Sequence, residues 1–242
     1  MTFKNACIKA LDVTDDDMKK INKLAVRSLK KEDVYVFKLV LGDNEVDDRN
    51  FEPFNLNALK DLARLYIGKT IIKDHIRRTD NQVARIFDTE LDYSSGKLTK
   101  KNEPFATLIA KCYMLILDSN ADLRKEIDAG IKKEVSTSMR PKKAICSICG
   151  IDVMKKYCPH WNGREYEVGD EKRVCTFTLD GADDAYEASF VVAPAQRRAG
   201  VVKSFCKSIE KENSDGNNDT PDEEKQKDID VAEARYRALM SF

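Results

Sequence analysis

The stretch VYVFKLVL at residues 34–41 decides the fold class, because it is short and consists almost entirely of β-branched, aromatic and aliphatic residues. Such a run is typical of a strand that is buried on both faces. The same signals predict further strands, and apolar residues at helical spacing predict separate helices. The strands are expected at residues 70–72, 83–91, 106–117, 131–139, 173–179 and 186–192, and the helices at residues 15–29, 55–66 and 120–129. This mixture predicts an α+β fold, with a small curled sheet or barrel flanked by helices.

The composition is that of one compact domain without a dominant charge. The 242 residues include 42 basic and 42 acidic side chains, so no overall field draws the chain onto nucleic acid or an anionic membrane. Apolar residues make up 42% of the chain, which suffices for one core of ordinary size. The uninterrupted apolar run at residues 113–117 is too short to cross a bilayer, and the amino terminus lacks an apolar signal stretch. We therefore expect a cytosolic protein that requires neither a membrane nor nucleic acid.

The chain divides into a main domain and a charged carboxyl-terminal extension. Residues 1–206 are expected to form the main domain, which includes a metal-binding insertion at residues 144–165. Residues 207–230 are rich in Lys, Glu, Asp, Asn and Ser with almost nothing apolar, so they cannot bury enough surface to fold alone. We predict a disordered linker there. Alanine and helical spacing return at residues 231–242, which predicts a short helix.

The chain has only two histidines, and one of them closes a cysteine cluster. The ligand types and spacing of this cluster suit a tetrahedral zinc site; its members are Cys146, Cys149, Cys158 and His160. Four ligands leave no open position for water, so we expect structural Zn²⁺ that orders a loop. The other cysteines are scattered singly, as buried thiols usually are, which fits a reducing compartment; they are Cys7, Cys112, Cys175 and Cys206.

His75 is the remaining imidazole that could activate a nucleophile near neutral pH. It follows the predicted strand at residues 70–72, and side chains at strand ends commonly project into clefts. Ser136 and Ser138 lie in a predicted strand, where alternation places both on one face. On position alone the alternatives stay open: His75 as a surface or packing residue, and the serines as a cross-strand hydroxyl pair. The sequence contains no G-x-S-x-G nucleophile elbow.

The order of five segments carries a family resemblance. GKTIIKDH at residues 68–75 is followed by the strands at 83–91 and 107–117, by AGIKKEVS at 129–136, and by YEASFVVAPA at 186–195. This order resembles that of the prohead proteases of tailed phages, a family related in fold to the herpesvirus assemblins. The resemblance covers residues 34–202.

The resemblance implies a serine endopeptidase that cleaves scaffold and capsid-protein extensions during phage head maturation. It implies that His75 is the general base and that Ser136 is the nucleophile. In assemblins the third member of the triad is a second histidine, whereas phage relatives use an acidic residue. Glu187 falls at the corresponding place, with Asp183 and Asp184 as alternatives. This carboxylate would hold the imidazole in the correct tautomer and stabilise the imidazolium.

Two further features follow from the resemblance. Assemblins carry paired arginines in an oxyanion loop shortly after the third triad member, and Arg197 and Arg198 occupy a similar place. The alternative for these arginines is a solvated turn before Gly200. The family commonly has glycine two residues after the nucleophile, whereas this chain has Ser138. Ser138 could therefore substitute for Ser136.

The implied partners are scaffold and major capsid proteins, and a homo-oligomer is expected. The implied location is the host cytoplasm, inside the assembling phage prohead. Self-cleavage within residues 208–230 is a further expectation. The alternative function is that of a non-catalytic, zinc-bearing capsid assembly or nucleic-acid-binding protein, in which Ser136 and His75 are structural.

Overall fold

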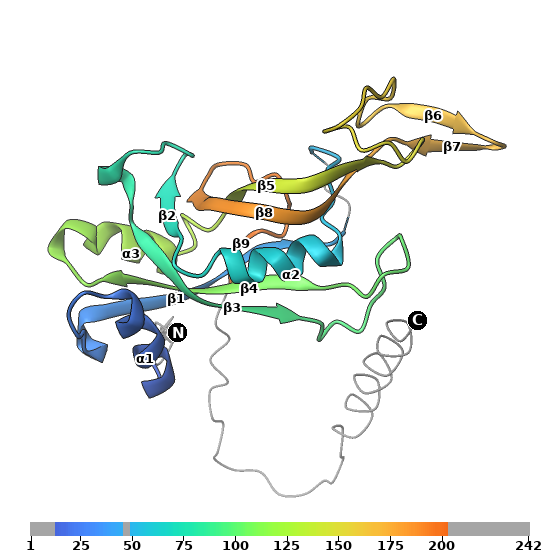
Figure 1. The fold of residues 1–242 in the computed structure, drawn as a ribbon. Helices are drawn as coiled ribbons and strands as arrows, with labels where there is room; N and C mark the ends of the chain where they lie inside the picture. The colour runs from blue at the N-terminus through green and yellow to red at the C-terminus, as the bar shows by residue number, and fades with distance from the viewer. Residues whose placement is uncertain (1–12, 46–48, 203–242) are drawn as a thin grey trace, which may run out of the picture.

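A computed structural model describes residues 13–45 and 49–202 and shows a mixed α+β fold built on one curled sheet (Figure 1). The sheet has seven strands in the order β5-β8-β2-β3-β4-β1-β9. They are β1 (Val34–Asp43), β2 (Thr70–Lys73), β3 (Ala84–Asp92), β4 (Thr107–Leu115), β5 (Val135–Cys146), β8 (Phe177–Phe190) and β9 (Gly200–Val201). The predicted linker at residues 207–230 and the predicted helix at residues 231–242 lie outside the described residues.

The two ends of the sheet approach each other. Neighbouring strands are antiparallel, except that β2 and β8 run parallel. At one end β9 pairs with β1, and Gly200 in β9 also forms a bridge with Glu134, the residue before β5. The Val201 N–H donates to the carbonyl oxygen of Lys133 over 2.7 Å. The sheet is therefore a curled half-barrel, and the prediction of an α+β fold with a curled sheet is confirmed.

Strand β1 is buried on both faces, as its composition predicts. Alternate residues face a large core inside the curled sheet; they are Tyr35, Phe37, Leu39 and Leu41. On the opposite face, Val34 and Val36 pack against Met18 and Ile21 of α1 (Asp15–Leu24). Complete burial of an aliphatic side chain of this size contributes about 1.5–3 kcal/mol, so β1 joins the two packing layers.

Helix α2 (Leu56–Leu65) packs against β8 and β3 and supplies much of the large core (Figure 1). It begins at its cap Asn55, whose side-chain oxygen accepts the Ala58 N–H over 2.9 Å. Beyond its last turn Gly68 has a φ of 83°, a left-handed conformation that glycine adopts without strain. The predicted helix at residues 55–66 is thus present. The other helices are α3 (Ala121–Asp128) and the short 3₁₀ turns Lys31–Asp33, Thr79–Asn81 and Asp118–Asn120.

The first helix is shorter than the sequence pattern predicts. It ends at Leu24 and not at residue 29. The Asn22 side chain accepts the Leu29 N–H over 2.8 Å and donates to the Leu29 carbonyl oxygen over 3.1 Å. These bonds fold the chain back against the helix. Leu29 consequently packs against the smaller core from a loop and not from a helix.

The longest strands also differ from their predicted bounds. The extended segment expected at residues 131–139 starts at Val135 and continues to Cys146, because register shifts after Ser138 and Arg140 accommodate Pro141. The strands expected at residues 173–179 and 186–192 are present only in part, because residues 177–179 and 186–190 belong to a single strand. The structure has β7 (Glu171–Val174) and then one continuous strand, β8.

The insertion forms a separate unit at the far end of β5 and β8 (Figure 1). It continues past the predicted insertion at residues 144–165 into a two-stranded sheet of β6 (Glu165–Val168) and β7. The ribbon projects away from the curled sheet (Figure 1). None of the helices in the described residues is long and apolar enough to span a membrane.

Candidate active site and metal centre

His75 sits on a tight turn directly after β2. The parallel pairing of β2 with β8 places Ile72 opposite Ser189, and the His75 N–H donates to the Ser189 hydroxyl oxygen over 2.9 Å. Asp74 and His75 have φ values of 55° and 54°. This left-handed conformation costs a non-glycine residue about 1 kcal/mol or more, and such strain is concentrated at functional sites. The Asp74 N–H donates to the Phe190 carbonyl oxygen over 2.9 Å, so β8 holds the turn at two successive residues.

The imidazole of His75 is paired with a buried carboxylate. His75 Nδ1 lies 2.9 Å from Glu187 Oε1, and the Glu187 side chain is only 3% exposed. The other carboxylate oxygen, Oε2, accepts a hydrogen bond from Arg77 Nε over 3.2 Å. A carboxylate only accepts hydrogen bonds, so Nδ1 carries the proton in this pair and Nε2 is the nitrogen able to accept one.

The two alternative carboxylates face other partners. Asp184 pairs with Lys69 over 3.1 Å, and Asp183 pairs with Arg140 over 3.8 Å. Of the three acidic residues that the sequence offers for this role, Glu187 is therefore the one that contacts His75.

Both candidate serines lie on the same face of the sheet as Glu187. In the antiparallel register of β5 with β8, Ser136 lies opposite Ser189 and Ser138 lies opposite Glu187. The Ser138 hydroxyl oxygen is 3.4 Å from His75 Nδ1. Among the described residues, Ser136 makes no side-chain hydrogen bond, and none joins it to His75. The structure thus brings together His75, Glu187 and Ser138, and the role of Ser136 as nucleophile stays a prediction.

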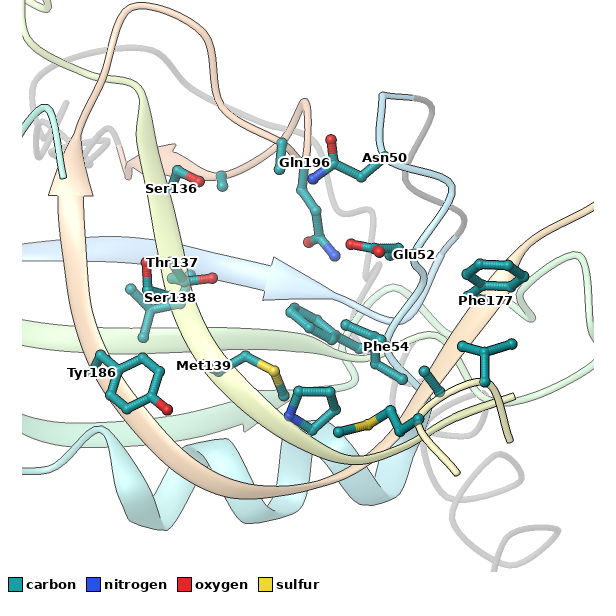
Figure 2. A pocket seen from close by; sticks show the side chains of 18 of the residues that line it. Asn50, Glu52, Phe54, Ser136, Thr137, Ser138, Met139, Phe177, Tyr186 and Gln196 are labelled. Carbon is teal, nitrogen blue, oxygen red and sulfur yellow. The ribbon is translucent and has the colours of Figure 1, made fainter. Parts of the chain in front are cut away.

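A pocket of about 550 Å³ runs along the edge of β5 that faces away from β8. Figure 2 shows the β5 wall, with Phe54, Glu52 and Gln196 across from it. The β5 residues in this wall are Ser136, Thr137, Ser138, Met139, Pro141 and Ala144. Arg77 and Tyr186 also line the pocket, and the Arg77 guanidinium stacks over the Tyr186 ring at 4.9 Å. A ligand in this pocket can therefore reach both serines, whereas His75 and Glu187 are not among its lining residues.

The expected oxyanion loop is tied to the end of β1. Arg198 Nε donates to Asp43 Oδ2 over 2.8 Å, and its guanidinium lies 4.9 Å from the centre of the Phe105 ring. The neighbouring Gln196 accepts the Asp43 N–H over 2.7 Å. Gln196 lines the pocket, whereas Arg197 and Arg198 are not among its lining residues. The role of the two arginines in binding an oxyanion stays a prediction.

The four predicted metal ligands converge. One ligand atom from each of Cys146, Cys149, Cys158 and His160 lies within 4.8 Å of the others. The Sγ atoms of Cys149 and Cys158 are 3.5 Å apart, and His160 Nδ1 lies 3.5 Å from Cys158 Sγ and 3.8 Å from Cys146 Sγ. Two thiolates at zinc–sulfur distances of about 2.3 Å in a tetrahedron are separated by about 3.8 Å. The cluster can bind a metal ion and is compatible with zinc.

The thiol of Cys146 is prepared for metal binding. Burial acts to raise the pKa of Cys146, but hydrogen bonds from the backbone N–H groups of Cys149 and Ile148 lower it below the usual value of 9.0. The Ile148 N–H lies 3.4 Å from the Cys146 sulfur. Because the thiolate is the form that binds metal, these donors favour the ligand form of the side chain.

Three residues that contact these sites are not predicted from the sequence to belong to them. Arg77 and Ser189 contact the catalytic candidates, and Cys175 lies with its sulfur 3.7 Å from Cys146 Sγ. The sequence EYEVGDEKRV at residues 165–174 contains the signal for Cys175: alternation on both sides of Gly-Asp predicts a hairpin that returns the chain to the cluster. Arg77 and Ser189 have no comparable signal, because their contacts join β8 to the segment that follows β2.

No protein-family model matches this chain, and neither a curated protein nor a solved structure matches it. The fold and the sites define a mixed α+β protein with a half-barrel sheet, a histidine paired with a buried carboxylate and a Cys/His metal cluster. The resemblance to prohead proteases stays a prediction that rests on the order of the sequence segments.

Proposed function

We propose that this protein is a serine endopeptidase in which Ser136 is the nucleophile, His75 the general base and Glu187 the carboxylate that orients it. The single observation that carries the proposal is the 2.9 Å contact between His75 and the buried Glu187, on a sheet face that also bears two serines. The pocket along β5 is lined by both serines, which gives a substrate access to the proposed nucleophile.

In this mechanism the two nitrogens of His75 have different tasks. Nδ1–H donates to Glu187, and Nε2 accepts the Ser136 proton as the Ser136 oxygen attacks the scissile carbonyl carbon. Nε2 then gives this proton to the leaving amine, and a water molecule hydrolyses the acyl-enzyme by the same path. The nearly complete burial of Glu187 strengthens its interaction with the imidazolium, because the effective dielectric is lower than in water.

Ser136 is preferred to Ser138 as the nucleophile for a geometric reason. Ser138 approaches Nδ1, whose proton is committed to Glu187, so this nitrogen cannot accept a proton from it. Ser136 lines the pocket on the same face and lies opposite Ser189, which binds the His75 backbone. The family resemblance also assigns the nucleophile to Ser136.

The proposed substrates are the scaffold protein and the extensions of the major capsid protein, cleaved during phage head maturation. Support comes from the order of the sequence segments and from the shape of the pocket, which follows one edge of β5. An extended polypeptide can pair with a strand edge through main-chain hydrogen bonds while its side chains enter alternate pockets. The proposal includes a homo-oligomer that acts in the host cytoplasm, inside the prohead.

The proposed role of the metal is structural Zn²⁺. Cys146 is the last residue of β5, and His160 lies before β6, so the ion would fasten the projecting unit to the sheet. Three thiolates and one imidazole complete a tetrahedron and leave no position for a reacting water molecule.

Co-expression with the scaffold and capsid proteins tests the function. Ser136→Ala should accumulate uncleaved precursors, whereas Ser138→Ala, a matched change two residues along the same face, should retain cleavage. Normal maturation with Ser136→Ala contradicts the proposal. Cleavage that is lost in Ser138→Ala and kept in Ser136→Ala contradicts the choice of nucleophile.

One observation favours the second candidate, a non-catalytic assembly or nucleic-acid-binding protein. Two aromatic side chains next to the metal cluster are largely exposed, Tyr157 at 86% and Trp161 at 65%. Exposed aromatic residues are common at binding surfaces. In this case His75→Ala and Ser136→Ala would leave maturation intact, and Trp161→Ala would impair it.

A further inference from the structure

Cys175 lies beside the metal cluster without belonging to the predicted ligand set. Its side chain is completely buried, and its sulfur lies 3.7 Å from the sulfur of Cys146. The backbone of Cys175 is fixed at the base of the β6–β7 ribbon: its N–H donates to the Arg164 carbonyl oxygen and its carbonyl oxygen accepts from Gly163 N–H, each over 2.8 Å. The thiol is therefore held next to the cluster by the segment that follows His160.

A fifth donor residue thus lies against Cys146, beside the four residues whose ligand atoms are all within 4.8 Å of one another. The 3.7 Å separation of the Cys146 and Cys175 sulfurs matches the value of about 3.8 Å for two thiolates that share a tetrahedral zinc ion. The ordinary alternative is that Cys175 only fills space as a small apolar side chain. Its position against a ligand sulfur favours a role in metal binding.

We propose that Cys175 is a second candidate for the fourth metal ligand. Its thiolate binds the metal in place of His160 when the imidazole is not coordinated. Cys146, Cys149 and Cys158 are common to both ligand sets. His160 completes the set in the arrangement present here, where its Nδ1 lies 3.5 Å from Cys158 Sγ.

The environments of the two residues suit such an exchange. His160 is partly exposed and packs edge-on against Tyr166, with the ring centres 4.7 Å apart. Cys175 is buried next to Cys146, so its thiol stays beside the cluster when the His160 side chain moves away. Exchange of imidazole for thiolate adds one negative charge to the site and keeps four-coordinate geometry. This inference does not depend on peptidase activity.

Loading the full-length protein with Co²⁺ in place of zinc tests the proposal, since sulfur-to-cobalt charge-transfer absorption reports the number of thiolate ligands. Four proteins are compared: the unchanged chain, His160→Ala, Cys175→Ser and His160→Ala/Cys175→Ser. His160→Ala should bind one metal ion per chain with stronger charge-transfer absorption than the unchanged chain. Cys175→Ser should match the unchanged chain in stoichiometry and spectrum. The double variant should bind Co²⁺ at least tenfold more weakly than His160→Ala.

Several outcomes overturn the proposal. If neither His160→Ala nor the milder His160→Asn takes up metal, Cys175 does not replace the histidine. Equal affinities for His160→Ala and the double variant, or an unchanged charge-transfer intensity in His160→Ala, lead to the same conclusion. Loss of metal from Cys175→Ser alone would show that Cys175 is an obligatory ligand, which also contradicts an exchange.

Discussion

Glu187 Oε1 lies 2.9 Å from His75 Nδ1, and the two side chains differ sharply in exposure, at 3% for the carboxylate and 39% for the imidazole. One edge of the ring is thus fixed by the protein, while part of it remains accessible. The parallel pairing of β2 with β8 produces this arrangement, because it places the turn after β2 over the carboxyl-terminal part of β8. The arrangement is that of an imidazole held on one side by a buried carboxyl group.

Glu187→Gln is expected to reduce kcat/KM for peptide cleavage by roughly 10²–10⁴-fold, because the amide cannot stabilise the imidazolium and can favour the wrong tautomer. Steady-state cleavage of a capsid-derived peptide measures the change. Asp184→Asn is the matched control, since Asp184 pairs with Lys69 and not with His75. Undiminished turnover in Glu187→Gln would show that this carboxylate does not orient the base.

Arg77→Ala is expected to destabilise the fold by about 1–3 kcal/mol, because a buried carboxylate oxygen loses its hydrogen-bond donor. Urea unfolding measures this loss. In the double variant Arg77→Ala/Glu187→Gln the total loss of unfolding free energy should be smaller than the sum of the losses in the two single variants. Arg78→Ala removes a neighbouring arginine from an exposed pair with Asp80 and should change stability by less than 1 kcal/mol. Equal effects of Arg77→Ala and Arg78→Ala would contradict the assignment.

Removal of the metal is expected to lower the unfolding temperature, because ligand binding to the folded cluster is coupled to folding. A chelator should produce the shift in calorimetry, and added Zn²⁺ should reverse it. Cys149→Ser should have the lower transition from the start and should not respond to zinc. An unchanged melting curve with lost activity would contradict a structural role.

Asp61 should make stability depend on acid pH. Burial acts to raise the pKa of Asp61, but hydrogen bonds from Lys142, the Ala182 backbone N–H and Arg64 lower it below 3.8. A carboxyl group with a depressed pKa in the folded state stabilises the fold above its unfolded pKa, and this contribution is lost as pH falls through the folded pKa. Stability should therefore drop below about pH 4.

The Asp61 contribution is measurable by urea unfolding at a series of pH values from 7 to 3. Asp61→Asn should flatten the acid limb, and Lys142→Gln should flatten it partly, because Lys142 Nζ donates to Asp61 Oδ2 over 2.8 Å. If the unfolding free energy falls equally at acid pH in Asp61→Asn and in the unchanged chain, the Asp61 carboxylate does not stabilise the contact of α2 with β5 and β8.

Local sequence patterns predict which helices and strands are present better than they predict where strands end and how they pair. The two-sided burial of β1 and the Asn55 cap of α2 follow from local composition and are present. The continuous strand β8 was not predicted, because Asp180 and Gly181 interrupt its apolar pattern. In the fold Asp180 pairs with Lys143 of β5, and Gly181 beside it has a φ of 69°. Long-range pairing overrides the local signal there.

The metal cluster is predictable because its ligands are close in sequence, whereas the His75 site is assembled from β2, β5 and β8. Sequence order nominates His75 and Glu187, and the structure places them in contact. The sequence cannot show which serine lies near which ring nitrogen of His75, because alternation along the strand places Ser136 and Ser138 on the same face. The contribution of Arg77 depends on the β2–β8 register and leaves no local mark.

The most direct test of the account is reaction of the purified protein with a fluorophosphonate probe, followed by peptide mapping in a mass spectrometer. Such probes label a serine that an adjacent base activates. We expect an adduct on Ser136 in the unchanged chain and in Ser138→Ala, and no adduct in a folded His75→Ala variant. An adduct that persists in His75→Ala, or a folded, metal-loaded protein that shows none on Ser136, would contradict it.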